Sequence, residues 1–298
     1  MIEYSACENY PKASITPPPP PVPSHALTQA LQDLKHSCIQ GDLERFQSTL
    51  NGISIGDSLH GSNIVNLSGV MIQAIKLGRT CFVKELLRHE VPLFPIYINE
   101  AIKTKVNAKD ILEILFENGW DINHPMGAMD PPILSNALDD LEMITWLLDR
   151  GADPNRRCNI DFTPLSYAVE HAALPIVSLL LNRGGDVTKG QVLHHAVARD
   201  SDAVEVLKLL IARGALINGI MYQNHRPSWD MYLFMGETPL HKAVFFRKID
   251  VIHHLLREGA DLNVKDVRGR TAIQCADEDI RREIIGWRGR DEEGTNCA

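Results

Sequence analysis

Histidine and cysteine are the residues of this chain that could hold a metal ion or move a proton. Imidazole and thiolate groups are common metal ligands, and imidazole is also the commonest general base. The candidates are His194, His195, His241, His253, His254 and Cys275. Adjacent helical positions point in different directions, so His253 and His254 do not form a paired site. Cys275 stands where a small buried side chain is expected.

Longer catalytic patterns are absent from the sequence. It contains no HExxH, GxSxG or GxGxxG pattern and no Gly-rich phosphate loop. Its carboxylates fall at helix caps, turns and solvent faces rather than as an isolated pair in an apolar setting. We therefore expect no catalytic residue, no metal site and no cofactor, and a protein that is not an enzyme. An enzyme with an unrecognised site is the disfavoured alternative.

An aromatic stretch over residues 219–235, GIMYQNHRPSWDMYLFM, has the composition of a contact surface. The chain is only 6% aromatic, yet four aromatic residues lie within 13 positions. Trp, Tyr and Arg dominate the energetics of protein interfaces. The candidate partner-binding residues here are Tyr222, Arg226, Trp229, Tyr232 and Phe234. The pattern predicts a recognition loop that anchors a partner.

A second interpretation is that these rings fold back over neighbouring turns and cover apolar surface of the chain itself. The two interpretations are compatible. Trp229 and Phe234 could pack inward while Tyr222, Arg226 and Tyr232 face outward.

Two earlier turns add further candidates. Met126 and Met129 offer adaptable contact side chains in one turn. Arg156, Arg157 and Phe162 flank the next turn. Taken singly, each residue of this kind is more often a solvated turn side chain than a contact residue. Together with the aromatic stretch, they are expected to line one edge of the molecule.

The elements that must position these residues recur at a regular spacing. An apolar residue followed three positions later by alanine marks each first helix. These pairs are Met71/Ala74, Ile98/Ala101, Leu134/Ala137, Leu165/Ala168, Leu193/Ala196, Leu240/Ala243 and Ile273/Ala276. Their mean separation is about 34 residues, typical of a repeat protein. Leu193 and Leu240 are 47 apart, so the aromatic stretch brings about 14 extra residues into one repeat.

A second apolar helix and a glycine-ended turn follow most of these starts. The second helices are expected within 82–87, 111–116, 143–148, 176–181, 204–211 and 251–256. The glycines that end them are Gly119, Gly151, Gly184, Gly214 and Gly259, in positions that suit a left-handed C-terminal residue. Asp and Asn residues such as Asp153 and Asn155 then suit the turn.

The most complete unit spans residues 236–263. Thr238 can cap its first helix, and Pro239 occupies the first helical position. Its Thr-Pro-Leu-His start (238–241) and Gly-Ala-Asp-Leu-Asn end (259–263) resemble the ankyrin repeat. The resemblance covers roughly residues 25–288. It implies stacked helix pairs with protruding turns that bind other proteins. It also implies structural hydrogen bonds for His194 and His241, which stand at the family's histidine position.

We therefore expect an all-α ankyrin-repeat solenoid of helix–turn–helix units in which short turns form protruding fingers. Residues 1–24 are expected to be disordered, and Pro17 to Pro21 either ligate a Pro-binding domain or form a stiff spacer. The array is expected over 25–288, with a helical cap at 25–51, about seven repeats and a polar cap at 269–288. Residues 289–298 read as an acidic tail.

Composition and charge indicate which partners and which cellular compartment to expect. The net charge of −8 argues against direct binding to nucleic acid or an anionic membrane. Six widely spaced cysteines do not suggest a disulfide framework, so a reducing compartment is expected. The start, MIEYSACENY, lacks a secretory signal, and no apolar run reaches ~20 residues. We expect a cytoplasmic or nuclear protein that is neither secreted nor transmembrane.

The predicted function is a non-catalytic protein–protein interaction module. It would act as an adaptor or scaffold through the concave face and turn loops of the array. We expect a monomer that binds one or more proteins. A transcriptional co-regulator that binds a DNA-bound factor is the alternative.

Overall fold

The computed structural model describes residues 25–54, 62–232 and 236–295, with side chains described over 25–53, 67–232 and 236–287. The Pro-rich segment at 1–24 and the candidate Phe234 lie outside these ranges. The chain divides into two compact units, residues 1–70 and residues 71–298. All regular structure in the described residues is helical, apart from an isolated bridge between Lys265 and Thr271. This agrees with the expected all-α class.

The first unit contains two complete helices, α1 (His25–Gln40) and α2 (Leu43–Ser54). They pack on each other through fully buried Leu34 and Phe46. The Asp42 side chain accepts a hydrogen bond from the Arg45 N–H at 3.0 Å and so caps α2. These helices occupy the region expected to hold the helical cap, and their role as a cap stays a prediction. Helix α3 (Ser62–Lys76) contains the residue at which the units divide.

The second unit is a succession of short helices. They are α4 (Thr80–Arg88), α5 (Pro95–Thr104), α6 (Ala108–Glu117), the 3-10 helix η1 (Ile133–Asn136), α7 (Leu141–Asp149), α8 (Pro164–His171), α9 (Leu174–Asn182), α10 (Val192–Ala198), α11 (Ala203–Ala212), α12 (Arg226–Met231), α13 (Pro239–Phe245), α14 (Ile249–Arg257), α15 (Ala272–Cys275) and α16 (Glu278–Thr295).

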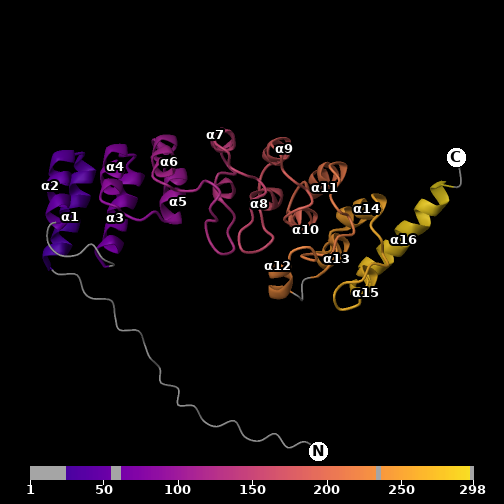
Figure 1. Ribbon diagram of the computed structural model, residues 1–298. Helices are drawn as coiled ribbons and strands as arrows, with labels where there is room; N and C mark the ends of the chain where they lie inside the picture. Colours follow the sequence, from indigo (N-terminus) through magenta and orange to yellow (C-terminus); the bar gives the residue numbers. More distant parts are fainter. Residues whose placement is uncertain (1–24, 55–61, 233–235, 296–298) are drawn as a thin grey trace, which may run out of the picture. The chain divides into compact units, whose positions relative to one another are not determined.

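These helices form antiparallel pairs that stack one after another, as Figure 1 shows for α8/α9, α10/α11 and α13/α14. The first helices of the pairs contact each other in the order α5, η1, α8, α10, α13, α15, and we call these the inner helices. The second helices α11, α14 and α16 contact each other on the opposite side. Leu165 and Leu240, which begin two inner helices, are almost completely buried. Each pair thus covers its apolar face with its neighbours, as a repeat array requires.

Local sequence explains where the inner helices begin and the outer ones end. Thr238 is extended, and its hydroxyl accepts a hydrogen bond from the His241 N–H, while Pro239 opens the helix. Thr163 does the same for α8 in a capping box with Ser166. After α14, Gly259 takes a φ of 94°, which a side chain would disfavour. These positions agree with the sequence-based expectations.

The turn asparagines link neighbouring repeats in a way that the sequence did not reveal. The Asn155 side chain donates to Gly184 O at 2.8 Å and accepts from the Asp186 N–H at 2.7 Å. Asn123 makes the same two bonds to Gly151 and Asp153, and Asn218 to Gly259 and Asp261. Thr188 stands at the corresponding position of the repeat between them. Its side chain bonds to Asp186 of its own turn instead.

Two elements differ from the regular unit. The inner helix expected at Leu134 and Ala137 is a single 3-10 turn, in which Ser135 Oγ donates to Pro132 O at 2.9 Å. At the other end, α16 continues to Thr295, so most of the expected acidic tail is helical. None of the helices over the described ranges is long and apolar enough to span a membrane.

Candidate functional site

Most of the candidate histidines have structural partners. His194 Nε2 donates to Glu237 O at 2.8 Å, and His241 Nε2 donates to Arg270 O at 2.9 Å. In each case the carbonyl belongs to the residue just before the next inner-helix start. Ser166 takes the same position one repeat earlier, and its hydroxyl donates to Gly190 O at 2.6 Å. The structural role expected for His194 and His241 is therefore confirmed.

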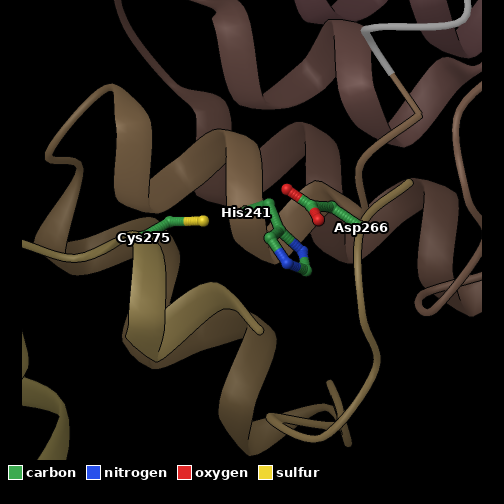
Figure 2. A group of neighbouring side chains, drawn as sticks. All are labelled: His241, Asp266 and Cys275. Carbon is green, nitrogen blue, oxygen red and sulfur yellow. The ribbon is translucent and has the colours of Figure 1, made fainter. Parts of the chain in front are cut away.

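One group has the composition of a metal site. Figure 2 shows His241 between Asp266 and Cys275, and one ligand atom from each lies within 4.8 Å of the others. However, both His241 nitrogens are engaged, since Nδ1 bonds to the Thr238 hydroxyl at 2.8 Å. The Asp266 carboxylate accepts from two backbone N–H groups and from the Arg270 guanidinium. A metal ion would have to break these bonds, so the cluster fits a structural role.

The aromatic stretch folds back onto earlier turns. Helix α12 lies on the side of the inter-repeat loops (Figure 1). The hydroxyl of fully buried Ser228 accepts a hydrogen bond from the Asp161 N–H at 2.7 Å. That hydroxyl also lies 2.9 Å from His225 Nδ1, which caps α12. The Tyr232 hydroxyl donates to Met129 Sδ at 3.7 Å.

Asp161 is the centre of this assembly. Its buried carboxylate accepts bonds from Arg157 of its own loop and from Gln191 and the Gly190 N–H (3.1 Å) of the next repeat. Because its backbone N–H also bonds to Ser228, one residue joins two repeats and the insert. We call the layer formed by residues 124–131, 156–162 and 219–232 the loop layer.

The candidates differ in exposure. Exposed are Met129, Arg156 and Arg226; half-buried are Arg157, Phe162, Trp229 and Tyr232; buried are Met126 and Tyr222. The expectation that Tyr222 faces outward is wrong, because the residue is only 7% exposed and its ring centroid lies 5.5 Å from that of Tyr232. Burial raises the pKa of Tyr222 to about 12. Arg226 does face outward, where it pairs with Asp230 at 2.8 Å. Their binding to a partner stays a prediction.

Sequence reasoning missed a polar row on the inner helices. On α8, α10 and α13, one residue bonds to the backbone of the next repeat. The residues directly after it occupy equivalent positions in the three repeats, and they are Tyr167, His195 and Lys242. The Glu170 carboxylate accepts from His195 Nδ1 at 2.6 Å, and this bond lowers the pKa of Glu170. Burial lowers the pKa of His195, which favours the neutral form of its ring. The repeat register itself would have identified this row.

Comparison with known protein families agrees with the stacked pairs. A sequence profile described as ankyrin repeats (3 copies) matches residues 98–191, 133–221 and 193–285, more than half of the chain. The chain belongs to the ankyrin repeat family. Ankyrin repeats generally serve as protein–protein interaction modules and typically carry no catalysis themselves.

Relatives match only part of the array. The ankyrin repeat protein nuc-2 of Neurospora crassa is 31% identical over 149 residues, covering 49% of this chain and 13% of nuc-2. The putative ankyrin repeat protein FPV031 of Fowlpox virus is 31% identical over 134 residues, covering 42% and 36%. NF-kappa-B inhibitor alpha of Gallus gallus is 33% identical over 86 residues, covering 28% and 23%. This ankyrin repeat chain thus spans well under two thirds of each relative.

A solved structure also matches this ankyrin repeat chain. The human ASB11 ankyrin repeat domain is 19% identical, with a TM-score of 0.44, over 85% of this chain and 96% of that one.

Proposed function

We propose that this chain is a non-catalytic adaptor that presents the loop layer and the inner-helix face to partner proteins. The observation that carries the proposal is the anchored insert. Ser228 fixes α12 to Asp161 through a fully buried bond, while Arg226 and Met231 on the same helix remain exposed. A loop held in place before binding loses little conformational entropy when a partner docks.

The exposed side chains of the loop layer supply suitable contact chemistry. Met129 is 47% exposed and Met231 is 59% exposed, and methionine adapts to irregular partner surfaces. Arg156 and Arg226 add cations beside them. An insertion in a repeat array commonly lies on its binding face.

We place this activity in a reducing compartment inside the cell. Cys81, Cys158 and Cys275 are free thiols over the described ranges, which is the usual state of cysteines there. Imaging of the full chain in cells would report whether it works in the nucleus, the cytoplasm or both.

Affinity capture with the full chain tests the proposal. The variant Arg226→Glu with Met231→Ala keeps Ser228 and its bond, so it should fold normally. We expect it to lose captured partner by about tenfold or more, as interface anchors do. Lys208→Glu, an exposed change on α11, is the matched control and should capture normally. Deletion of residues 220–234 should also abolish capture.

The thermal melt of every variant must be measured alongside capture. Normal capture by a folded double variant and by a folded deletion variant would remove the loop layer from the proposal.

A further inference from the structure

The C-terminal end of helix α13 and the residue after it present two exposed aromatic side chains. Phe245 is 77% exposed and Phe246 is 44% exposed, and their rings meet edge to face at 5.4 Å. Lys242 lies one turn earlier on the same face, with Nζ 6.0 Å from the Phe246 ring centroid. Two adjacent exposed phenylalanines are unusual on a protein surface and favour a contact site.

The cations around this face fall into two groups. Arg247 is paired with Asp277, and Arg270 is held by Asp266. By contrast, the side-chain nitrogens of Lys242 and Arg268 make no hydrogen bond or ion pair with any residue over the described ranges. Lys242 is half-buried, and burial lowers its pKa. An incoming carboxylate would offset the cost of keeping this ammonium charged.

The nearby protein charges leave a cationic excess. Glu237 interacts with both free cations, and its own pKa is raised by burial. Among the groups that act on Glu237 and Lys242, four cations (Lys242, Lys248, Arg268 and Arg270) stand against three carboxylates (Glu170, Glu237 and Asp266). Glu170 interacts with Lys242 from α8, two inner helices away, but it is already bonded to His195. A negative group from a partner therefore has a complementary site.

A pocket of about 410 Å³ adjoins this face. Its lining includes Phe245, Glu237 and Arg268, together with the three side chains of Figure 2. Its size falls in the range of ligand-binding pockets, so it can admit a large side chain. Because His241 and Asp266 already have partners, the Phe245 ring and the Arg268 guanidinium remain available to a ligand.

We propose that α13 and this pocket bind a partner segment in which an acidic residue is followed by a large aliphatic residue. The acidic side chain meets Lys242 and Arg268, and the aliphatic side chain packs on Phe245 at the pocket mouth. The inference rests on the proposed adaptor function and assigns its inner-helix face a ligand chemistry.

Acetylated and amidated peptide sublibraries with random flanks provide the test. Their fixed central pair is Glu-Leu, Gln-Leu, Lys-Leu or Glu-Gly, and the probe is the labelled full chain. We expect selective binding to the Glu-Leu sublibrary. For the best Glu-Leu peptide, anisotropy should show about a tenfold loss of affinity on replacing Glu by Gln. Rising salt should weaken the Glu peptide more than the Gln peptide.

Protein variants locate the site. Lys242→Met keeps the aliphatic stem and removes the charge, and Arg268→Gln removes the second cation. Each should weaken the Glu-Leu peptide about fivefold or more while leaving the Gln peptide unchanged. Phe245→Ser should weaken both peptides. The controls are Lys208→Met and Leu216→Ser, exposed changes elsewhere that should alter neither binding nor the melt.

Equal binding of the Glu, Gln and Lys sublibraries, or binding by none of them, overturns the inference. So does a folded Lys242→Met variant with unchanged affinity. The proposed adaptor function would still hold in that case if the Arg226→Glu/Met231→Ala variant and the deletion variant capture less partner than the parent. The reverse pattern, peptide selectivity with normal capture by those variants, would move the adaptor site to α13.

Discussion

The hydroxyl of Ser228 accepts a hydrogen bond from the backbone N–H of Asp161 at 2.7 Å, across 67 positions of the chain. Both residues are at most 2% exposed. The bond fixes the insert on the turn of an earlier repeat. It converts an aromatic insertion into a part of the array, with one side packed and the other exposed.

Replacing Ser228 by alanine should therefore destabilise the fold. The change leaves the buried Asp161 N–H without an acceptor, which costs roughly 1–3 kcal/mol. Chemical denaturation would measure the loss. Ser201→Ala, at an exposed serine, should stay within about 0.5 kcal/mol of the parent. An unchanged denaturation midpoint for Ser228→Ala would show that the insert is not anchored there.

The hydrogen bonds that the turn asparagines make between repeats predict a loss of stability when Asn155 is replaced. Asn155→Ala removes two hydrogen bonds to the backbone of the next repeat and should cost roughly 1–3 kcal/mol. Thermal or chemical unfolding measures it. Thr188→Ala is the comparison, because Thr188 bonds only within its own turn and its loss should cost less.

The same hydrogen bonds predict a gain of stability when Thr188 is replaced by asparagine. An asparagine there is placed to donate to Gly214 O and to accept from the Leu216 N–H, so Thr188→Asn should stabilise the array by about 1 kcal/mol. A rise in the unfolding midpoint would confirm it. A midpoint at or below that of the parent would contradict the assigned register.

Core packing predicts a larger effect at Leu240, which is 1% exposed. Leu240→Ala removes buried methyl groups and leaves a cavity, which should cost roughly 2–5 kcal/mol. Leu216→Ala, at a residue 55% exposed, is the matched control and should have little effect. Equal melting temperatures for the two variants would show that the repeat register is wrong.

Acid should destabilise the array through its buried histidines. Burial lowers the pKa of His194 from 6.5 to about 3, so the unfolded chain binds its proton more readily. The stabilisation is complete above pH 6.5 and is lost as the pH falls from 6.5 towards 3, by up to about 1.4 kcal/mol per pH unit. His195, whose pKa is also lowered, acts in the same direction.

The free energy of unfolding measured between pH 7 and pH 4 checks this. His194→Gln can still donate to Glu237 O but does not titrate, so its stability should fall less steeply with pH. His124→Gln, at an exposed histidine, should keep the slope of the parent. Identical slopes for all three proteins would rule out His194 as a source of the pH dependence.

The fold could be predicted because its contacts repeat. Thr238, Pro239 and Gly259 act on their own helix ends, and His241 bonds to a residue 29 positions away, close to one repeat period. In such an array each unit meets only its neighbours, so a periodic sequence implies a periodic set of contacts. The candidate site was less predictable. Tyr222 is as aromatic as Tyr232, and nothing in the local sequence shows that it is buried.

The sequence by itself determined the helix pairs, their caps and the position of the insert, since these depend on neighbouring residues or on a fixed period. Only the tertiary structure decided which turns the insert contacts. Asp161 and Ser228 meet across 67 positions, and Tyr232 and Met129 across 103, separations that no repeat period encodes. The same stacking places Phe245 and Arg268 in the lining of one pocket. Which side chains remain unpaired there depends on every neighbour at once.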